Sequence, residues 1–249
     1  MRLDLFLEKN KIFDSRTKAK QAIERGEIYV NAIKIDKPSY QVDENAIIER
    51  KYLKDFVSLG GFKLEKALKD FEYDVNGLIA VDIGSSTGGF TDCLLKNGVD
   101  RVYAVDLNSD LLHPSLKNNE NVIEIIKNAK LLTKDDFGDC IDLVVADLSF
   151  ISSTLILPVI SNVIDSGKEV ILLIKPQFEN DEKIKFKNGI IREEKYRRKA
   201  CQKVFDCAIK NGLIPIRFTT APISPDKNVE YLILLRKDVK NSIDLKEFF

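Results

Sequence analysis

The sequence predicts an α/β fold, with a mostly parallel sheet covered on both faces by helices and a small α+β unit in front of it. From about residue 76 onward, short apolar stretches alternate with stretches of helical periodicity, which is the pattern of a parallel sheet. The first fifty residues carry short helices and strands of their own. A chain of 249 residues with 44% hydrophobic and 31% charged residues suits one large globular domain and one small one.

Seven strands are expected in the larger region, and helical stretches such as 89–97 and 192–210 fall between several of them. The expected strands are 78–83, 101–106, 122–126, 141–147, 169–175, 213–219 and 231–235. We expect the domains to be 1–56 and 63–249, with 57–62 as the linker.

The N-terminal region is expected to form a helix over 16–24 followed by strands at 28–30 and 46–48. Asp14-Ser15 can cap that helix, and Gly26 tolerates the positive φ with which helices often end. Residues 9–25 hold six basic residues against two acids, and residues 183–203 hold nine against two. A charge run is often only a solvated surface, but binding to phosphate requires such local positive density.

Composition excludes several classes of protein. Lys+Arg and Asp+Glu are both 39, so net charge does not by itself indicate a nucleic-acid partner. The four cysteines form no C-x-x-C pair and His113 is the sole histidine, so we expect no metal site. No apolar run approaches the roughly 20 residues of a membrane helix, and the start lacks a signal-peptide core. We therefore expect a cytoplasmic protein that does not bind membranes.

A glycine-rich turn follows the first strand of the larger region. It reads Asp82-Ile-Gly-Ser-Ser-Thr-Gly-Gly-Phe90 and differs from the G-x-G-x-x-G of dinucleotide enzymes. Asp106 ends the next strand about twenty residues later, where a carboxylate can accept hydrogen bonds from ribose hydroxyls. This combination favours S-adenosylmethionine over NAD as the cofactor. The expected binding residues are Asp82, Gly84, Ser85, Ser86, Thr87, Gly88, Gly89, Phe90, Asp106, Leu107 and Asp147.

Four charged residues lie where a core strand or its edge would normally stay apolar. Asp147 and Lys175 each end an apolar run, Glu230 precedes one, and Lys63 follows Gly60-Gly61-Phe62. The carboxyl ends of parallel strands face the ligand crevice of such a sheet. We therefore expect Asp147 and Lys175 to converge beside the cofactor.

Two resemblances make this interpretation specific. The string SRTKAKQAIERGEIYVNAIKIDKPSYQV resembles an S4 domain, a small RNA-binding module. The whole chain resembles the TlyA family, in which an S4 domain precedes an FtsJ-like methyltransferase. The matching strings are SLGGFKLEKAL, DIGSSTGGFTDCLLKNG, VYAVD, ADLSFIS, LIKPQFE, KNGIIR and NVEYLILL.

The resemblance implies a Rossmann-like class I methyltransferase fold and a ribosomal RNA 2′-O-methyltransferase that acts on cytidine with S-adenosylmethionine. It maps the catalytic tetrad to Lys63, Asp147, Lys175 and Glu230. It also implies that basic residues of the S4 region bind RNA phosphates, which positions the protein without reading sequence. Those residues are Arg2, Lys11, Arg16, Lys18, Lys20 and Arg25.

The chemistry of ribose methylation explains these residue types. A ribose hydroxyl is a poor nucleophile and must lose its proton as it attacks the sulfonium methyl group. Lys175 is the best candidate base, and a second ammonium, Lys63, would favour its neutral form by like-charge repulsion. Asp147 and Glu230 would hold the lysines and balance their charge. General-base assistance is worth roughly 10²–10⁴ in rate, and in-line positioning about 7–11 kcal/mol.

Two alternatives to this enzyme stay open at the level of sequence. One is a non-enzymatic RNA-binding or ribosome-assembly protein, and the other is a membrane-active hemolysin, a name that the family carries. Leu59, the segment 107–114 and Lys130 depart from the family pattern. His113 lies in that segment, and we expect it to be an exposed loop residue. The target nucleotide, the ribosomal subunit and the oligomeric state are not predicted.

Overall fold

The computed structural model describes residues 1–24, 26–50, 56–180, 186–222, 227–240 and 242–249. The chain divides into two compact units, residues 1–55 and residues 56–249. The predicted Arg25 of the RNA-binding set lies outside the described residues.

The N-terminal unit has two helices and a three-stranded antiparallel sheet of order β2-β1-β3. Its elements are α1 (Leu3–Lys9), α2 (Arg16–Glu24), β1 (Ile28–Val30), β2 (Ile33–Lys34) and β3 (Ile48–Arg50). Helix α2 begins as predicted, because the Ser15 hydroxyl accepts a hydrogen bond from Lys18 N at 3.3 Å. Gly26 follows its end at φ +76°. Strand β3 starts at Ile48 rather than at Ala46, and β2 was not predicted.

The C-terminal unit contains the predicted seven-stranded, mostly parallel sheet, in the order β6-β5-β4-β7-β8-β10-β9. Strand β10 runs antiparallel to both of its neighbours, while β4 to β8 are mutually parallel. The strands are β4 (Ile79–Ile83), β5 (Arg101–Asp106), β6 (Val122–Ile126), β7 (Leu143–Ala146), β8 (Glu169–Ile174), β9 (Leu213–Thr220) and β10 (Tyr231–Lys237). Every predicted strand exists, and their ends differ by up to two residues.

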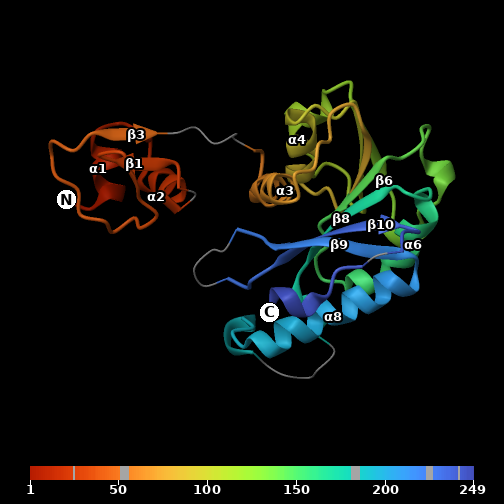
Figure 1. The fold of residues 1–249 in the computed structure, drawn as a ribbon. Helices are drawn as coiled ribbons and strands as arrows, with labels where there is room; N and C mark the ends of the chain where they lie inside the picture. Colours follow the sequence, from red (N-terminus) through yellow and green to blue (C-terminus); the bar gives the residue numbers. More distant parts are fainter. Residues whose placement is uncertain (25, 51–55, 181–185, 223–226, 241) are drawn as a thin grey trace. The chain divides into compact units, whose positions relative to one another are not determined.

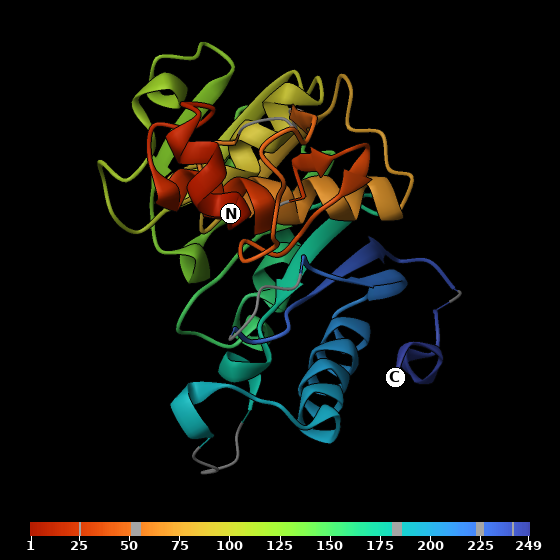
Figure 2. The ribbon, with the colours of Figure 1, turned by 90° about the vertical axis from the view of Figure 1, so that its left-hand side faces the viewer.

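Helices cover both faces of this sheet (Figure 1). The longer ones are α3 (Leu59–Asp70) and α4 (Gly89–Lys96) on one face, and α6 (Leu157–Val163) and α8 (Glu194–Lys210) on the other. Figure 2 shows α8 beside the blue strands. The short helices are α5 (Pro114–Lys117), α7 (Pro176–Glu179), η1 (Ala129–Leu131), η2 (Lys134–Asp136), η3 (Ser153–Leu155), η4 (Lys187–Gly189) and η5 (Leu245–Phe248).

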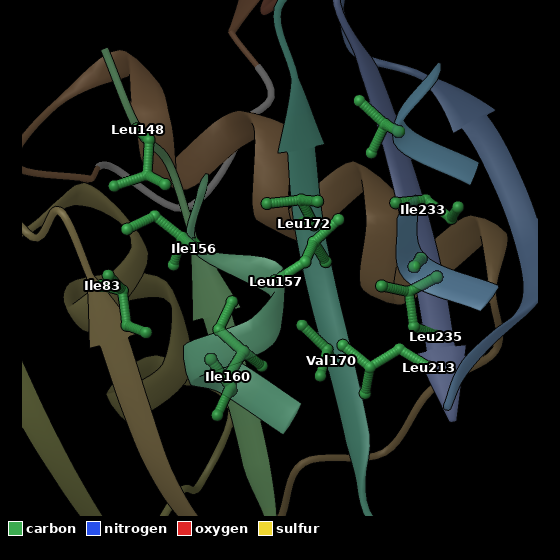
Figure 3. Packing of buried hydrophobic residues seen from close by; sticks show 14 of the residues in the cluster. Ile83, Leu148, Ile156, Leu157, Ile160, Val170, Leu172, Leu213, Ile233 and Leu235 are labelled. Atoms are coloured by element: carbon green, nitrogen blue, oxygen red, sulfur yellow. The ribbon is translucent and has the colours of Figure 1, made fainter. Parts of the chain in front are cut away.

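Alternation along the strands divides the core into two layers. Leu172 on β8 points toward α6, where it packs with Leu157 and Ile160 (Figure 3). Its neighbours Ile171 and Leu173 point to the opposite face, which α3 and α4 cover. These side chains are almost fully buried, and each contributes about 1.5–3 kcal/mol of hydrophobic free energy. The strand ends are therefore held on a rigid support.

The predicted linker 57–62 is largely wrong, because helix α3 already begins at Leu59 and belongs to the C-terminal unit. Val57 N donates a hydrogen bond to the Asp92 carboxylate at 2.9 Å. Gly60 and Gly61 would normally weaken a helix, but here they allow close packing. A Cβ at Gly61 would lie 2.3 Å from the Phe56 ring. Packing against Phe56 therefore requires glycine at residue 61, whereas a Cβ at Gly60 would come no closer than 3.4 Å to its neighbours.

Candidate functional site

Strand register brings several functional residues to one edge of the sheet. Ile83 of β4 pairs with Ala146 of β7, so Gly84 and Asp147 leave their strands side by side. A Cβ at Gly84 would lie 2.7 Å from the Asp147 carbonyl oxygen, which shows how closely the two backbones approach. Strand β8 is parallel to β7 and ends at Ile174, so Lys175 follows at the same edge.

Lys175 is held by two groups from the segment that follows β7. Its Nζ lies 2.5 Å from Asp147 Oδ1 and donates to Ser149 Oγ at 2.7 Å. Lys175 is only 8% exposed. A buried ammonium is tolerated because a carboxylate balances its charge and a hydroxyl accepts one of its protons.

Lys63 forms the second ion pair of the site. Its Nζ donates to Glu230 Oε2 at 2.6 Å, and Gln177 Nε2 donates to the other oxygen of Glu230 at 3.4 Å. Tyr231 pairs with Ile174, so Glu230 lies one step beyond, opposite Lys175. The structure thus brings the four predicted residues to one edge as two ion pairs, Lys175–Asp147 and Lys63–Glu230.

The glycine-rich turn after β4 lies at this edge too. Gly84 and Gly88 have φ of +83° and +89°, and Gly88 begins the turn into α4. Asp106, at the end of β5, accepts from Ser86 N at 2.9 Å and from Asn108 N at 3.1 Å. Each carboxylate oxygen thus accepts one bond and has a further lone pair for a ligand.

Asp82 belongs to β4 and precedes the turn by one residue. It is fully buried, and its Oδ2 accepts from both the backbone N and the hydroxyl of Thr91, at 2.9 and 2.7 Å. Burial, which outweighs these hydrogen bonds, raises the pKa of Asp82 to about 7, and the nearby Asp147 carboxylate adds to the effect. Asp82 therefore supports the turn through α4.

The remaining predicted cofactor residues surround the turn. Ser85 is buried, and Phe90 packs into the core between α3 and the sheet, so only its backbone is near the turn. Leu107 is 64% exposed. His113 is exposed, as expected, and its Nδ1 accepts from Ser115 N at 3.3 Å, which caps α5. The Thr87 carbonyl accepts from His113 N at 3.2 Å.

Four further residues belong to this edge and were not predicted. They are Ser149, Phe150, Gln177 and Glu179. Phe150 is 87% exposed with φ +65°, an unfavourable conformation for a bulky residue, and its ring lies 5.2 Å from that of Phe178. The available signal was the polar and aromatic character of the two strings that follow the strand ends, ADLSFIS and LIKPQFE.

In the N-terminal unit, a buried acid organises the basic residues. Asp4 is 1% exposed and accepts hydrogen bonds from Arg2 and Arg16 at 2.9–3.0 Å. The Arg2 hydrogen bonds contribute most to lowering the pKa of Asp4 to about 2, and Arg16 adds to this. The Arg16 side chain remains 50% exposed. Lys18 and Lys20 are exposed on α2 and pair with acids one turn away, and Lys11 is exposed.

Within the described ranges, no group of His, Cys, Asp and Glu side chains could hold a metal ion. In the same ranges, no helix is long and apolar enough to span a bilayer.

Comparisons with known proteins agree with this division. The model of the FtsJ-like methyltransferase family matches residues 56–237, and that of the S4 domain matches residues 1–48. The 16S/23S rRNA (cytidine-2′-O)-methyltransferase TlyA of Mycobacterium tuberculosis strain H37Rv is 32% identical over 98% of this chain and 93% of its own length. The chain belongs to the TlyA family.

Two other proteins are similar to this chain over most of their length and of its own. Hemolysin A of Brachyspira hyodysenteriae is 39% identical over 93% of this chain and 98% of its own. The solved structure of a Streptococcus thermophilus protein, provisionally named a hemolysin, is 34% identical, with a TM-score of 0.73 over 99% of this chain and 93% of that one. The predicted fold class, a Rossmann-like methyltransferase domain after an S4 domain, is confirmed.

Proposed function

We propose that this TlyA-family chain transfers a methyl group from S-adenosylmethionine to the 2′-hydroxyl of a cytidine in ribosomal RNA, in the cytoplasm. The observation that carries the proposal is the pair of ion pairs, Lys175–Asp147 and Lys63–Glu230, at the same sheet edge as the glycine-rich turn. The relative from Mycobacterium tuberculosis has this activity in its name.

The residues around the turn fit S-adenosylmethionine. Gly84 and Gly88 give the turn the positive φ and the close packing, against Asp147 and against Leu116, that a side chain would prevent, so the turn presents its backbone compactly to a cofactor. Asp106 presents carboxylate oxygens at the end of β5, which suits the two ribose hydroxyls of an adenosyl group. When bound, this cofactor supplies an electrophilic methyl group on a sulfonium ion.

The four charged residues would then hold the target hydroxyl and receive its proton. Lys175, which would have to be neutral at that moment, accepts the proton at Nζ. Asp147 and Ser149 fix the direction of Nζ, while Glu230 does the same for Lys63. Lys63 and Gln177 can bind the ribose or its phosphate beside the hydroxyl. Orientation contributes most, since aligned reactants can save about 7–11 kcal/mol.

The N-terminal unit would supply affinity for RNA. Arg2, Lys11, Arg16, Lys18, Lys20 and Arg25 are the proposed phosphate-binding residues. Asp4 holds the guanidinium groups of Arg2 and Arg16 in fixed orientations while both stay partly exposed. A planar guanidinium with spare N–H groups is well suited to a phosphate. These phosphate contacts would position ribosomal subunits on the enzyme but would not distinguish one base from another.

The test uses ribosomal subunits from cells that lack the gene and S-adenosylmethionine with a labelled methyl group. The wild-type chain should label one or both subunits, and 2′-O-methyl mapping should place the label on cytidine. Lys175→Ala should nearly abolish transfer, by about 10² or more, while cofactor binding survives. Lys168→Ala is the matched control, because Lys168 pairs with Asp142 at the opposite edge of the sheet.

No labelling of either subunit by the wild-type chain would overturn the proposed activity. Retained turnover in Lys175→Ala would leave the activity but exclude Lys175 as the base.

A further inference from the structure

Glu179 is a buried carboxylate that the proposed chemistry does not use. It is 2% exposed and lies in α7, the single turn of helix directly after Lys175. Its Oε1 accepts from the backbone N of Ser153 at 2.7 Å, and its Oε2 accepts from the hydroxyl of Ser152 at 2.5 Å.

These hydrogen bonds join two segments that carry the catalytic side chains. Ser152 and Ser153 end the loop that starts at Asp147 and contains Ser149, whereas Glu179 belongs to the turn that starts at Lys175. Lys203 of α8 donates from Nζ to the Glu179 carbonyl at 3.1 Å, which anchors the turn to a long helix. Beyond the ends of β7 and β8, no strand pairing fixes these two described segments to each other.

A buried carboxylate can only be retained there if its donors stay in place. Moving the loop away from α7 would leave a negative charge in the protein interior without hydrogen bonds, which is strongly unfavourable. The same loop residues determine where Asp147 and Ser149 stand relative to Lys175 Nζ, at 2.5 and 2.7 Å. The position of Nζ is thus coupled to the position of the Glu179 carboxylate.

We propose that Glu179 is a positioning residue for methyl transfer, which fastens the 147–153 loop to the turn after Lys175 and so keeps Asp147 and Ser149 on the Lys175 amine. The proposal rests on the proposed function of this edge. Glu179 itself would contact neither substrate nor cofactor.

The experiment compares two variants with the wild-type chain in the labelled-methyl assay. Glu179→Ala should lower kcat by about 10- to 100-fold, because misplacements of about 1 Å have that effect on aligned reactions. The KM for ribosomal subunits and the affinity for S-adenosylmethionine should change less than about twofold. Glu179→Gln should recover most of kcat, since its amide oxygen can accept from Ser153 N and the Ser152 hydroxyl can accept from its NH₂ group.

The pH profile of kcat separates positioning from a loss of folded protein. In Glu179→Ala the half-maximal pH should move, because Lys175 loses its fixed partners. Asp142→Ala is the matched control: Asp142 also joins two segments, through Ile79 N and Lys168, but at the other edge of the sheet. It should lower thermal stability and leave the pH profile of the folded enzyme unchanged.

Three results would overturn the proposal. The first is wild-type kcat in Glu179→Ala. The second is a loss that merely follows the folded fraction, with the pH profile unmoved. The third is a Glu179→Gln variant as inactive as Glu179→Ala, which would assign the effect to the charge. If Glu179→Ala does not fold, Ser152→Ala removes one donor and should lower kcat in the same way, by about threefold. An inactive wild-type chain would instead defeat the proposed function.

Discussion

At the scale of single residues, the site consists of buried and partly buried charges, and each has a partner of opposite charge. Lys175 has Asp147 and Ser149, and Lys63 has Glu230.

Phe150 differs from these residues, because its large apolar ring is exposed and its backbone has an unfavourable conformation next to this edge. Such strain persists in folded proteins mainly where function uses it. We therefore predict that Phe150 stacks on an RNA base.

Phe150→Ala should lower kcat/KM by about 5- to 150-fold, because stacking on an aromatic ring is worth about 1–3 kcal/mol per base. Thermal stability should hardly change, since the side chain is 87% exposed. Steady-state kinetics with ribosomal subunits would measure the effect. Phe150→Tyr keeps the ring and should retain activity, and Leu155→Ala is a control for removal of an exposed apolar side chain. Equal losses in all three variants would contradict stacking.

Sequence alone could indicate Asp147, Lys175 and Glu230 because each borders an apolar strand, whereas Lys63 lies in helix α3 and was indicated by the family resemblance. Ser149, Gln177 and Glu179 could not be found in that way, since they lie in loops and a short turn without periodicity. Their partners come from segments 26 or more residues away, and such pairing depends on strand register. Asp82 is fully buried and accepts hydrogen bonds from Thr91, and its predicted contact with the cofactor stays a prediction.

At the scale of elements, two features stabilise the junction between β4 and α4. One is the glycine-rich turn, and the other is the buried hydrogen bond between Thr91 and Asp82. Gly84 needs both a positive φ and the absence of a Cβ, whereas Gly77 needs only the positive φ, with open space around it. Strand β4 and the turn were predictable from their sequence pattern. The close approach of Gly84 to Asp147 depends on the parallel pairing of β4 with β7.

Gly84→Ala should therefore be much more damaging than Gly77→Ala. Both substitutions cost about 1–2 kcal/mol for the left-handed conformation. At residue 84 the new Cβ would also lie 2.7 Å from the Asp147 carbonyl oxygen and push Asp147 away from Lys175. We expect a larger fall in the free energy of unfolding and a loss of methyl transfer for Gly84→Ala alone. Chemical denaturation and the transfer assay would measure these; equal effects at both sites would refute the argument.

Asp82 gives the same junction a pH dependence. Its pKa is raised from 3.8 to about 7 in the folded chain, so between these values the folded state binds a proton that the unfolded state has lost. The contribution of Asp82 to stability must then fall as pH rises from about 4 to about 7, and level off above. Asp82→Asn cannot titrate. Between pH 5 and pH 7.5 the melting temperature of the wild type should fall relative to that of Asp82→Asn. A constant difference would show that Asp82 is ionised throughout.

At the scale of the whole molecule, two units divide the proposed task between RNA affinity and chemistry. The alternation of strands and helices predicted the larger fold, and the S4 and FtsJ-like matches confirm it. The boundary was less predictable, because the expected linker 57–62 overlaps the first turn of α3, which begins at Leu59. Net charge was uninformative, since the basic residues are concentrated while the total is balanced. The described structure adds Asp4, a buried acid in α1 that pairs with Arg2 and Arg16.

Because the two units have different proposed tasks, substitutions in the N-terminal unit should change the salt dependence of RNA binding without changing kcat. The double variant Arg2→Gln/Arg16→Gln should weaken binding of ribosomal RNA and reduce the slope of log K against log salt by about 2, one for each phosphate that is no longer neutralised. Lys134→Gln/Lys168→Gln removes the same charge where each lysine pairs with an acid at the far edge of the sheet, and should leave the slope within about 0.5. At saturating subunits the arginine variant should keep its kcat, because the groups around Lys175 are intact. A fall in kcat with an unchanged slope of log K against log salt would instead show that Arg2 and Arg16 act in methyl transfer and not in binding RNA phosphates.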